Sequence, residues 1–209
     1  MNQTIYSVLG QKGGSGKSTI SYALAVQQAG IGKKVLVADM DTEQHTISMW
    51  HEIRADKAPR FDVAKCSTLA DVGKKASGYD VVIIDGIPHA SKLTLEAAEC
   101  SHRVIIPTGT ALADLTPSVK MASQLVGRGV ERDAIRFVVV KTPSDAETKS
   151  AIETIEAYDF KASPHGLRFL ASYAKAQDKG QSVTEVSLVA QRIAARTMIE
   201  SIALEQQHG

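Results

Sequence analysis

A glycine-rich turn with two lysines lies near the start of the chain, at Lys12-Gly13-Gly14-Ser15-Gly16-Lys17-Ser18-Thr19. The apolar residues before it suit a buried strand, and residues 18–28 suit a helix. Backbone N–H groups in the first turn of such a helix face an anion, and the glycines let the backbone approach it closely. Lys17 can reach the β and γ phosphates of a nucleotide, and the Ser18 hydroxyl can hold Mg²⁺. An isolated Gly-Lys-Ser is typical of a solvated loop, but the flanking strand and helix predict a phosphate-binding loop.

The loop departs from the common G-x-x-x-x-G-K-[ST] pattern, which places its first glycine where this chain has Gln11. The chain instead carries an additional lysine, Lys12. From this position near the start of the loop, the Lys12 side chain could point away from its own nucleotide and across an interface. The pattern is the deviant form of a P-loop.

Two acidic sites follow apolar runs further along the chain. Asp39 and Asp41 follow the run 35–38, and Asp85 follows the run 81–84. In parallel α/β sheets, ligands bind at the carboxyl ends of the strands, where both sites would lie. A carboxylate at Asp85 is suited to orient a water in the Mg²⁺ shell, because Mg²⁺ keeps several waters and needs few protein ligands. The alternative for either residue of the first pair is that it caps the next helix.

Short apolar runs alternate with helix-length segments along the chain. The runs are continuous, which indicates strands buried on both faces of a parallel sheet. We expect strands at residues 5–9, 35–38, 81–84, 104–106 and 137–140, with weaker candidates at 61–65 and 167–170. We expect helices at residues 18–28, 69–76, 91–99, 115–126 and 145–157. This alternation predicts an α/β fold in which a doubly wound, mostly parallel sheet has helices on both faces.

Length and composition limit the remaining possibilities. A chain of 209 residues, 44% of them hydrophobic, can bury a substantial core, and no Pro- or Gly-rich linker divides it. We therefore expect one domain over residues 1–209. The formal net charge of +1 gives no overall attraction to nucleic acid, so DNA binding would need local basic patches. Cys66 and Cys100 form no C-x-x-C pair, and the sequence has no signal segment or membrane-length apolar run, which favours a cytoplasmic protein.

With these three motifs in place, the chain resembles a small ParA-type partition ATPase of the ParA/MinD deviant Walker A family over nearly its whole length. Weaker matches occur in the family's order at Trp50, Tyr79, Asp114, Tyr173 and Glu185. The resemblance implies hydrolysis of ATP with Mg²⁺ by a homodimer that encloses ATP. It also implies nonspecific DNA binding in the ATP-bound form, and stimulation by a ParB-like or other centromere-binding adaptor. Such a protein would be cytoplasmic and nucleoid-associated.

The resemblance implies roles for the residues that match the motifs. Lys12 matches the signature lysine that contacts the nucleotide of the opposite subunit. Asp39 and Asp41 match the Walker A′ motif, in which the second aspartate helps to position the attacking water. Asp85 matches Walker B. The implied catalytic residues are Lys12, Lys17 and Asp41, and the implied metal-site residues are Ser18, Asp39 and Asp85.

The loop after residues 137–140 is expected to select adenine, near Lys141 and Pro143. The chain differs from the common family pattern at Gly10, where Asn is frequent, and at residues 41–44, where Asp-Pro-Gln is frequent. It also has Gly86-Ile87-Pro88 where Thr-Pro-Pro is frequent after Walker B. A flexible turn followed by a stiff one could form a switch that senses the γ phosphate, although a plain loop has the same composition.

Candidate DNA contacts are basic residues in the last third of the chain. Lys175 and Lys179 lie four residues apart, as do Arg192 and Arg196, so each pair would share one helical face, and Arg168 is a further candidate. Such pairs are usually solvated surface. The family resemblance instead favours a patch that contacts the DNA backbone without reading bases.

Two other functional classes remain open. A MinD-like positioning ATPase would drive a terminal helix onto a membrane, but the apolar residues between 188 and 204 spread around the helix and leave no single stripe. We expect this helix to pack against the core or the other subunit, with no stable membrane association. A reductase of the nitrogenase-iron-protein type needs a pair of cysteines after Walker B, and Cys66 precedes it. The cargo could be a plasmid, a chromosome or a protein compartment.

Overall fold

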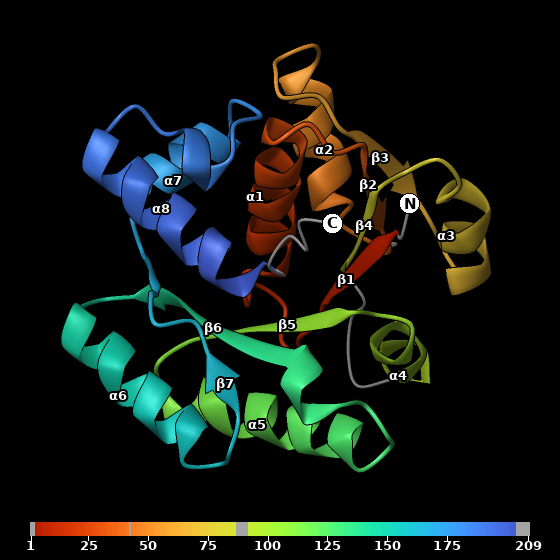
Figure 1. Cartoon of the computed structure of the whole chain (residues 1–209). Helices are drawn as coiled ribbons and strands as arrows, with labels where there is room; N and C mark the ends of the chain where they lie inside the picture. The colour runs from red at the N-terminus through yellow and green to blue at the C-terminus, as the bar shows by residue number, and fades with distance from the viewer. Residues whose placement is uncertain (1–2, 42, 87–91, 204–209) are drawn as a thin grey trace.

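The computed structural model describes residues 3–41, 43–86 and 92–203, in which a β-sheet lies between two layers of helices (Figure 1). The strand order is β3-β2-β4-β1-β5-β6-β7, with β8 paired to β6, and all of these pairs are parallel. The strands are β1 (Thr4–Val8), β2 (Val35–Asp39), β3 (Asp62–Lys65), β4 (Val81–Asp85), β5 (Arg103–Thr108), β6 (Ile135–Thr142), β7 (Lys161–Ala162) and β8 (Leu167–Arg168). The predicted α/β class and the doubly wound parallel sheet are confirmed.

The apolar runs form the central strands because both faces of the sheet are covered. Every residue of β2 and of β4 is buried. Successive side chains of β2 enter opposite layers, so Val35 and Val37 join one core cluster while Leu36 and Ala38 join the other. Continuous hydrophobic runs are typical of strands in this environment.

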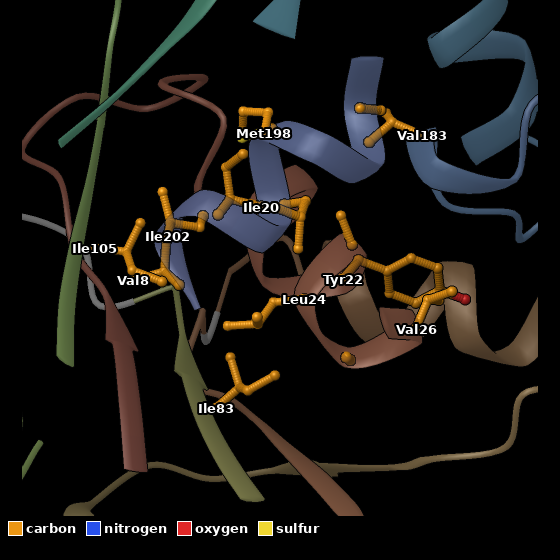
Figure 2. Close-up of a cluster of buried hydrophobic side chains, with 14 of the residues drawn as sticks. Val8, Ile20, Tyr22, Leu24, Val26, Ile83, Ile105, Val183, Met198 and Ile202 are labelled. Carbon is orange, nitrogen blue, oxygen red and sulfur yellow. The ribbon is translucent and has the colours of Figure 1, made fainter. Parts of the chain in front are cut away.

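Helices from different parts of the sequence cover the two faces (Figure 1). One face is covered by α1 (Lys17–Gly30), α2 (Thr46–Arg54), α7 (Ala171–Gln177), the short turn η2 (Val183–Glu185) and α8 (Val189–Ile202). The other face is covered by α3 (Leu69–Lys75), α4 (Lys92–Glu99), α5 (Leu112–Val126) and α6 (Asp145–Glu156), and the turn η1 (Arg132–Ala134) precedes β6. Figure 2 shows Met198 and Ile202 of α8 close to Ile20 of α1, within the first of these layers.

The predicted strands and helices occur close to their expected bounds. Strand β6 is longer than predicted, and α5 begins three residues earlier. The candidate strand at 61–65 is present as β3, whereas β8 keeps only the first two residues of the candidate at 167–170. Residue 91, at the start of one predicted helix, lies outside the described residues. The coarse pattern did not predict α2, because its start depends on a contact from β2: Ser48 donates its backbone N–H and its hydroxyl to Asp39 Oδ2, at 3.1 and 2.6 Å.

The packing of α8 confirms the prediction for the terminal helix over the second half of that helix. Met198, Ile199 and Ile202 are buried against the core, as expected. Leu188, Val189 and Ile193 remain more than half exposed in the single chain, and their packing against a second subunit stays a prediction. Residues 204–209, the last part of that prediction, lie outside the described residues. No helix in the described part of the chain is long and apolar enough to cross a membrane.

Candidate nucleotide-binding site

The glycine-rich loop lies at the carboxyl edge of the sheet, between the end of β1 and the start of α1. Gly16 is the N-cap of α1, no described side chain caps this helix, and its first turn contains no acidic residue. The amides of that turn are therefore open to an anion. Gly16 has a φ of 92°, and a Cβ there would lie 3.1 Å from a methyl carbon of Val140, so a side chain would be strained. Ser15 Oγ is buried and has no hydrogen-bond partner among the described residues, which fits an external acceptor such as a phosphate.

Lys17 is the cation of this loop. Its ammonium donates to the backbone oxygen of Lys12 at 3.3 Å. Burial lowers the pKa of Lys17, while the charges of Asp85 and Asp41 act in the opposite direction. The amine thus lies within the electrostatic reach of both predicted acidic sites.

Asp85 ends β4 and is almost fully buried beside the start of α1. Its carboxylate accepts hydrogen bonds from Ser18 Oγ at 2.9 Å and from Ser21 Oγ at 2.6 Å. Burial raises the pKa of Asp85 to about 6, and the two hydroxyl donors oppose that rise. A carboxylate and a hydroxyl held together are oxygen donors that suit Mg²⁺. Ser21, one turn beyond Ser18, was missed by the sequence analysis, and the i, i+3 spacing of the two serines on one helical face could have indicated it.

Asp39 accepts an amide of the first turn of α2, in line with the capping alternative, whereas Asp41 closes a turn that lies before α2 begins at Thr46. Asp39 is fully buried, and besides the two donors of Ser48 it accepts the backbone N–H of Asp41 at 3.2 Å. Asp41 Oδ1 accepts the backbone N–H groups of Glu43 and Gln44, at 3.1 and 2.9 Å. The metal role of Asp39 and the catalytic role of Asp41 stay predictions.

Gly86, the first residue after β4, lies directly against Asp41. Gly86 has a φ of 83°, and a Cβ there would lie 2.8 Å from both the Cβ and the backbone nitrogen of Asp41. Only glycine allows this approach. Ile87 and Pro88, the rest of the predicted switch, lie outside the described residues.

Lys12 lies at the rim of the loop and contacts α5. Its ammonium donates to the Ala113 oxygen at 2.5 Å and to Asp114 Oδ1 at 2.8 Å. Gly109 leaves room for this carboxylate, since a Cβ at that position would overlap Asp114. The Lys12 side chain remains half exposed, so an interface could still reach it. Its predicted contact with a second nucleotide is not tested by this arrangement.

The residues expected near adenine divide between the P-loop and the surface. Lys141 has a φ of 56°, and its ammonium donates to the Gly14 oxygen at 2.6 Å, so it braces the P-loop. Pro143 is exposed in the segment between β6 and α6. Thr19 Oγ1 accepts a hydrogen bond from Gln177 of α7 at 2.9 Å, a contact that spacing along the chain could not reveal.

A pocket of about 380 Å³ joins these parts. The P-loop, the segment after β2 and the residue after β4 all line it, together with Trp50 and Lys141. Its lining includes the predicted residues Gly13, Gly14, Ser15, Gly16, Lys17, Ser18, Thr19 and Asp41. The structure therefore brings most of the predicted nucleotide site together in one place.

The structure supports only part of what was predicted for the candidate DNA contacts. The prediction that Lys175 and Lys179 share a helical face is wrong, because α7 ends at Gln177 in a turn where Gly180 has a φ of 67°. Both lysines are exposed. Arg168 forms an ion pair with Asp145 at 3.1 Å.

Arg192 and Arg196 do share α8, as predicted. Arg192 donates to the Val186 oxygen at 3.0 Å, and Arg196 donates to the Thr184 oxygen at 3.1 Å. Part of each guanidinium is thus used to hold the segment that contains η2.

Comparisons with known proteins agree with the motifs. Residues 6–183 match the CobQ/CobB/MinD/ParA nucleotide binding domain. The chain is 28% identical over 196 residues to the sporulation initiation inhibitor protein Soj of Bacillus subtilis strain 168, covering 73% of this chain and 77% of Soj.

Solved structures share the fold. The cell division ATPase MinD of Pyrococcus furiosus has a TM-score of 0.73 and 19% identity, with 96% of this chain and 98% of MinD covered. The septum site-determining protein MinD of Pyrococcus horikoshii OT3, solved with Mg-ADP, has a TM-score of 0.68 and 18% identity, with 96% and 95% covered. Because the family match spans most of the chain, the protein belongs to the ParA/MinD family of nucleotide-binding ATPases.

Proposed function

We propose that the protein is an ATP-dependent partition ATPase that dimerises when it binds ATP, binds DNA without base readout, and is stimulated by a cargo-bound adaptor. The observation that carries the ATPase part is the meeting of Lys17, Asp41 and the Asp85–Ser18 pair at the uncapped start of α1. These groups provide a cation, a carboxylate near the phosphate position and a pair of oxygens for Mg²⁺. Together they match the needs of phosphoryl transfer, which relies mainly on positioning and on charge stabilisation.

Each residue has a distinct task in this proposal. Lys17 and the amides of the P-loop hold the β and γ phosphates, while Ser18 and Asp85 organise Mg²⁺, which when bound neutralises charge on the phosphate oxygens. Asp41 orients the attacking water. Lys141 keeps the loop in place through the Gly14 oxygen, because the ammonium is already 2.6 Å from it.

Lys12 links hydrolysis to dimerisation. In the single chain its charge is balanced by Asp114, at a half-exposed position on the rim of the P-loop. In the ATP-bound dimer we place it against the nucleotide of the other subunit. Lys12 would then leave Asp114 for the phosphates of the other subunit's nucleotide. The free energy lost with the first ion pair is small, since exposed ion pairs contribute only about 0–1 kcal/mol.

DNA binding follows from dimerisation. Net charge gives a single chain little attraction to DNA, whereas two copies of the exposed Lys175 and Lys179 could contact several phosphates at once.

Partition is favoured over a membrane-bound role because Met198, Ile199 and Ile202 of α8 are already buried in the core and are not free to enter lipid.

The test is binding to two unrelated DNA duplexes over a salt series, with ADP and with the slowly hydrolysed analogue ATPγS. We expect ATPγS-dependent binding to both duplexes, with each neutralised phosphate adding about 0.9 to the slope of log affinity against log salt. The double variant Lys175→Glu with Lys179→Glu should bind more weakly and flatten this slope. The control is Lys74→Glu with Lys120→Glu, which changes net charge equally on exposed residues of the opposite helical layer.

Three results would contradict the DNA-binding proposal: binding that is equal with ADP and ATPγS, an equal loss in the control, or ATPγS-dependent sedimentation with anionic vesicles in place of DNA. The ATPase proposal would survive each of them, since it depends on the P-loop and not on this patch.

A further inference from the structure

Helix α8 has a buried half and an exposed half. Its last two turns pack on α1 and the sheet. Its first turns leave Val189 and Ile193 each 57% exposed, and these residues lie four apart on one face of the helix. Leu188, the residue directly before α8, adds further exposed apolar area. Large apolar side chains grouped in this way mark an interaction surface.

A groove of about 1020 Å³ runs between this half of α8 and α6, over the segment 162–168. Figure 1 shows the two helices, α6 and α8, that form its walls. The α8 wall consists of residues spaced as one helical face: Ala190, Ile193, Ala194 and Thr197. The α6 wall also follows one helical face: Asp145, Thr148, Lys149, Ile152, Glu153 and Glu156. The groove is therefore bounded by two complete helix faces.

The two walls differ in charge. The α8 wall carries no ionisable side chain, whereas the α6 wall carries three carboxylates and one lysine, a net charge of −2, and Arg168 in the floor of the groove offsets one of these negative charges. Lys149 lies 3.8 Å from Glu153, and Arg168 pairs with Asp145. Glu156 has no ion pair within the described part of the chain. An occupant would thus meet apolar residues on one side and, on the other, an acidic edge in which Glu156 is unpaired.

We propose that this groove docks an amphipathic helix of a partner protein, with apolar side chains against Ile193 and Ala194 and with lysine or arginine side chains along the Glu153 and Glu156 edge. Apolar burial would provide most of the affinity, and the charges would fix orientation and select the partner. DNA and anionic lipid are disfavoured by the acidic wall. The proposal does not depend on nucleotide binding or on the partition role.

The test uses two synthetic helical peptides with the same pattern of leucines. One carries lysine and the other glutamate at its polar positions, and binding to the whole protein is followed by fluorescence anisotropy. We expect the lysine peptide to bind at least about 10-fold more tightly than the glutamate peptide. Ile193→Ser should weaken binding of the lysine peptide by about 10-fold, which corresponds to about 1.4 kcal/mol.

The chain offers matched controls. Ile31→Ser changes an isoleucine that is 52% exposed at the end of α1, far along the chain from the groove, and should leave peptide binding unchanged. Glu153→Lys should weaken the lysine peptide and strengthen the glutamate peptide, whereas Glu99→Lys on α4 should do neither. If Ile193→Ser lowers the urea midpoint, Ala194→Gln provides a second test, because Ala194 is an exposed residue of the same groove wall.

Several results would overturn the proposal. One is equal binding of the two peptides, and another is a peptide affinity that neither groove variant changes. A third is a dimer of the free protein, detected by sedimentation velocity, that Ile193→Ser dissociates, because the groove would then be occupied by a second copy. A fourth is sedimentation with anionic vesicles that Ile193→Ser abolishes, because the surface would then bind lipid.

Discussion

Replacing Asp85 by Asn should stabilise the nucleotide-free protein and weaken its response to Mg²⁺ and nucleotide. The carboxylate is 1% exposed, and burial raises its pKa from 3.8 to about 6 despite hydrogen bonds from Ser18 and Ser21. At about 1.4 kcal/mol per unit, this shift corresponds to about 3 kcal/mol, an upper limit on what the buried charge costs the fold. Asn fills nearly the same space without the charge, and the serine hydroxyls can turn to accept from its amide.

The pH dependence has a definite sign. Between pH 3.8 and about 6 the folded protein holds a proton on Asp85 that the unfolded chain has released, so the free energy of unfolding falls as the pH rises through this range. The cost is absent below the range and complete above it. The stabilising effect of Asp85→Asn should therefore be largest at neutral pH and should disappear in acid.

The assay is urea denaturation of the parent and of Asp85→Asn, at neutral and at acid pH, with and without Mg²⁺ and ATPγS. With nucleotide at about 100 times its Kd, the parent should gain about 2.7 kcal/mol, and the variant should gain clearly less. Asp56→Asn, which alters an exposed ion pair with Arg60, should shift the free energy of unfolding by less than about 0.5 kcal/mol. A variant that is less stable than the parent at neutral pH, or one that keeps the full nucleotide effect, would refute the reasoning.

Three further changes test other contacts. Lys12→Ala should leave the urea midpoint unchanged and weaken ATPγS-dependent dimerisation, and an unchanged dimer in sedimentation velocity would exclude its role across the interface. Asp41→Ala should still bind Mg²⁺ and ATPγS while phosphate release slows by about 100-fold, and release at the parent rate would exclude the catalytic assignment. Gly180→Ala should lower the free energy of unfolding by about 3 kcal/mol, because a Cβ there would overlap the backbone nitrogen of Arg54. Gly32→Ala is the matched control, since Gly32 has a similar positive φ and no neighbour within 4 Å, and an equal loss in the two variants would show that overlap is not the cause.

Local patterns predicted the elements and most of the candidate nucleotide site. The continuous apolar runs 35–38 and 81–84 specify buried parallel strands by composition alone, and the carboxyl ends of such strands lie at one edge, which brings Asp41 and Asp85 to the P-loop. Contacts between distant residues could not be predicted. Lys12 is 102 positions away from its partner Asp114, and Lys141 is 127 positions away from its partner Gly14. No periodicity in the sequence encodes such pairs.

The point where a helix ends and the side of a helix that stays exposed could not be predicted from the sequence either. The i, i+4 spacing of Lys175 and Lys179 indicates a shared face only if the helix continues, but α7 ends at Gln177, and Gly180, which has a positive φ, lies against the backbone of Arg54 in α2. Likewise, the apolar residues of α8 have similar hydrophobicity, yet Met198 is buried and Ile193 is not, because only the second half of the helix lies over α1. Burial of that kind is decided by tertiary packing.

The central claim is that the uncapped start of α1 and Lys17 form a site for the phosphates of ATP. The most direct test is equilibrium titration of the protein with a fluorescent ATP analogue and Mg²⁺, comparing the parent with Lys17→Ala and with the control Lys149→Ala, whose side chain is 80% exposed on α6. The account predicts saturable binding by the parent and by the control, and a loss of at least about 10-fold in affinity, or about 1.4 kcal/mol, for Lys17→Ala. Equal affinity of Lys17→Ala and the parent would contradict it.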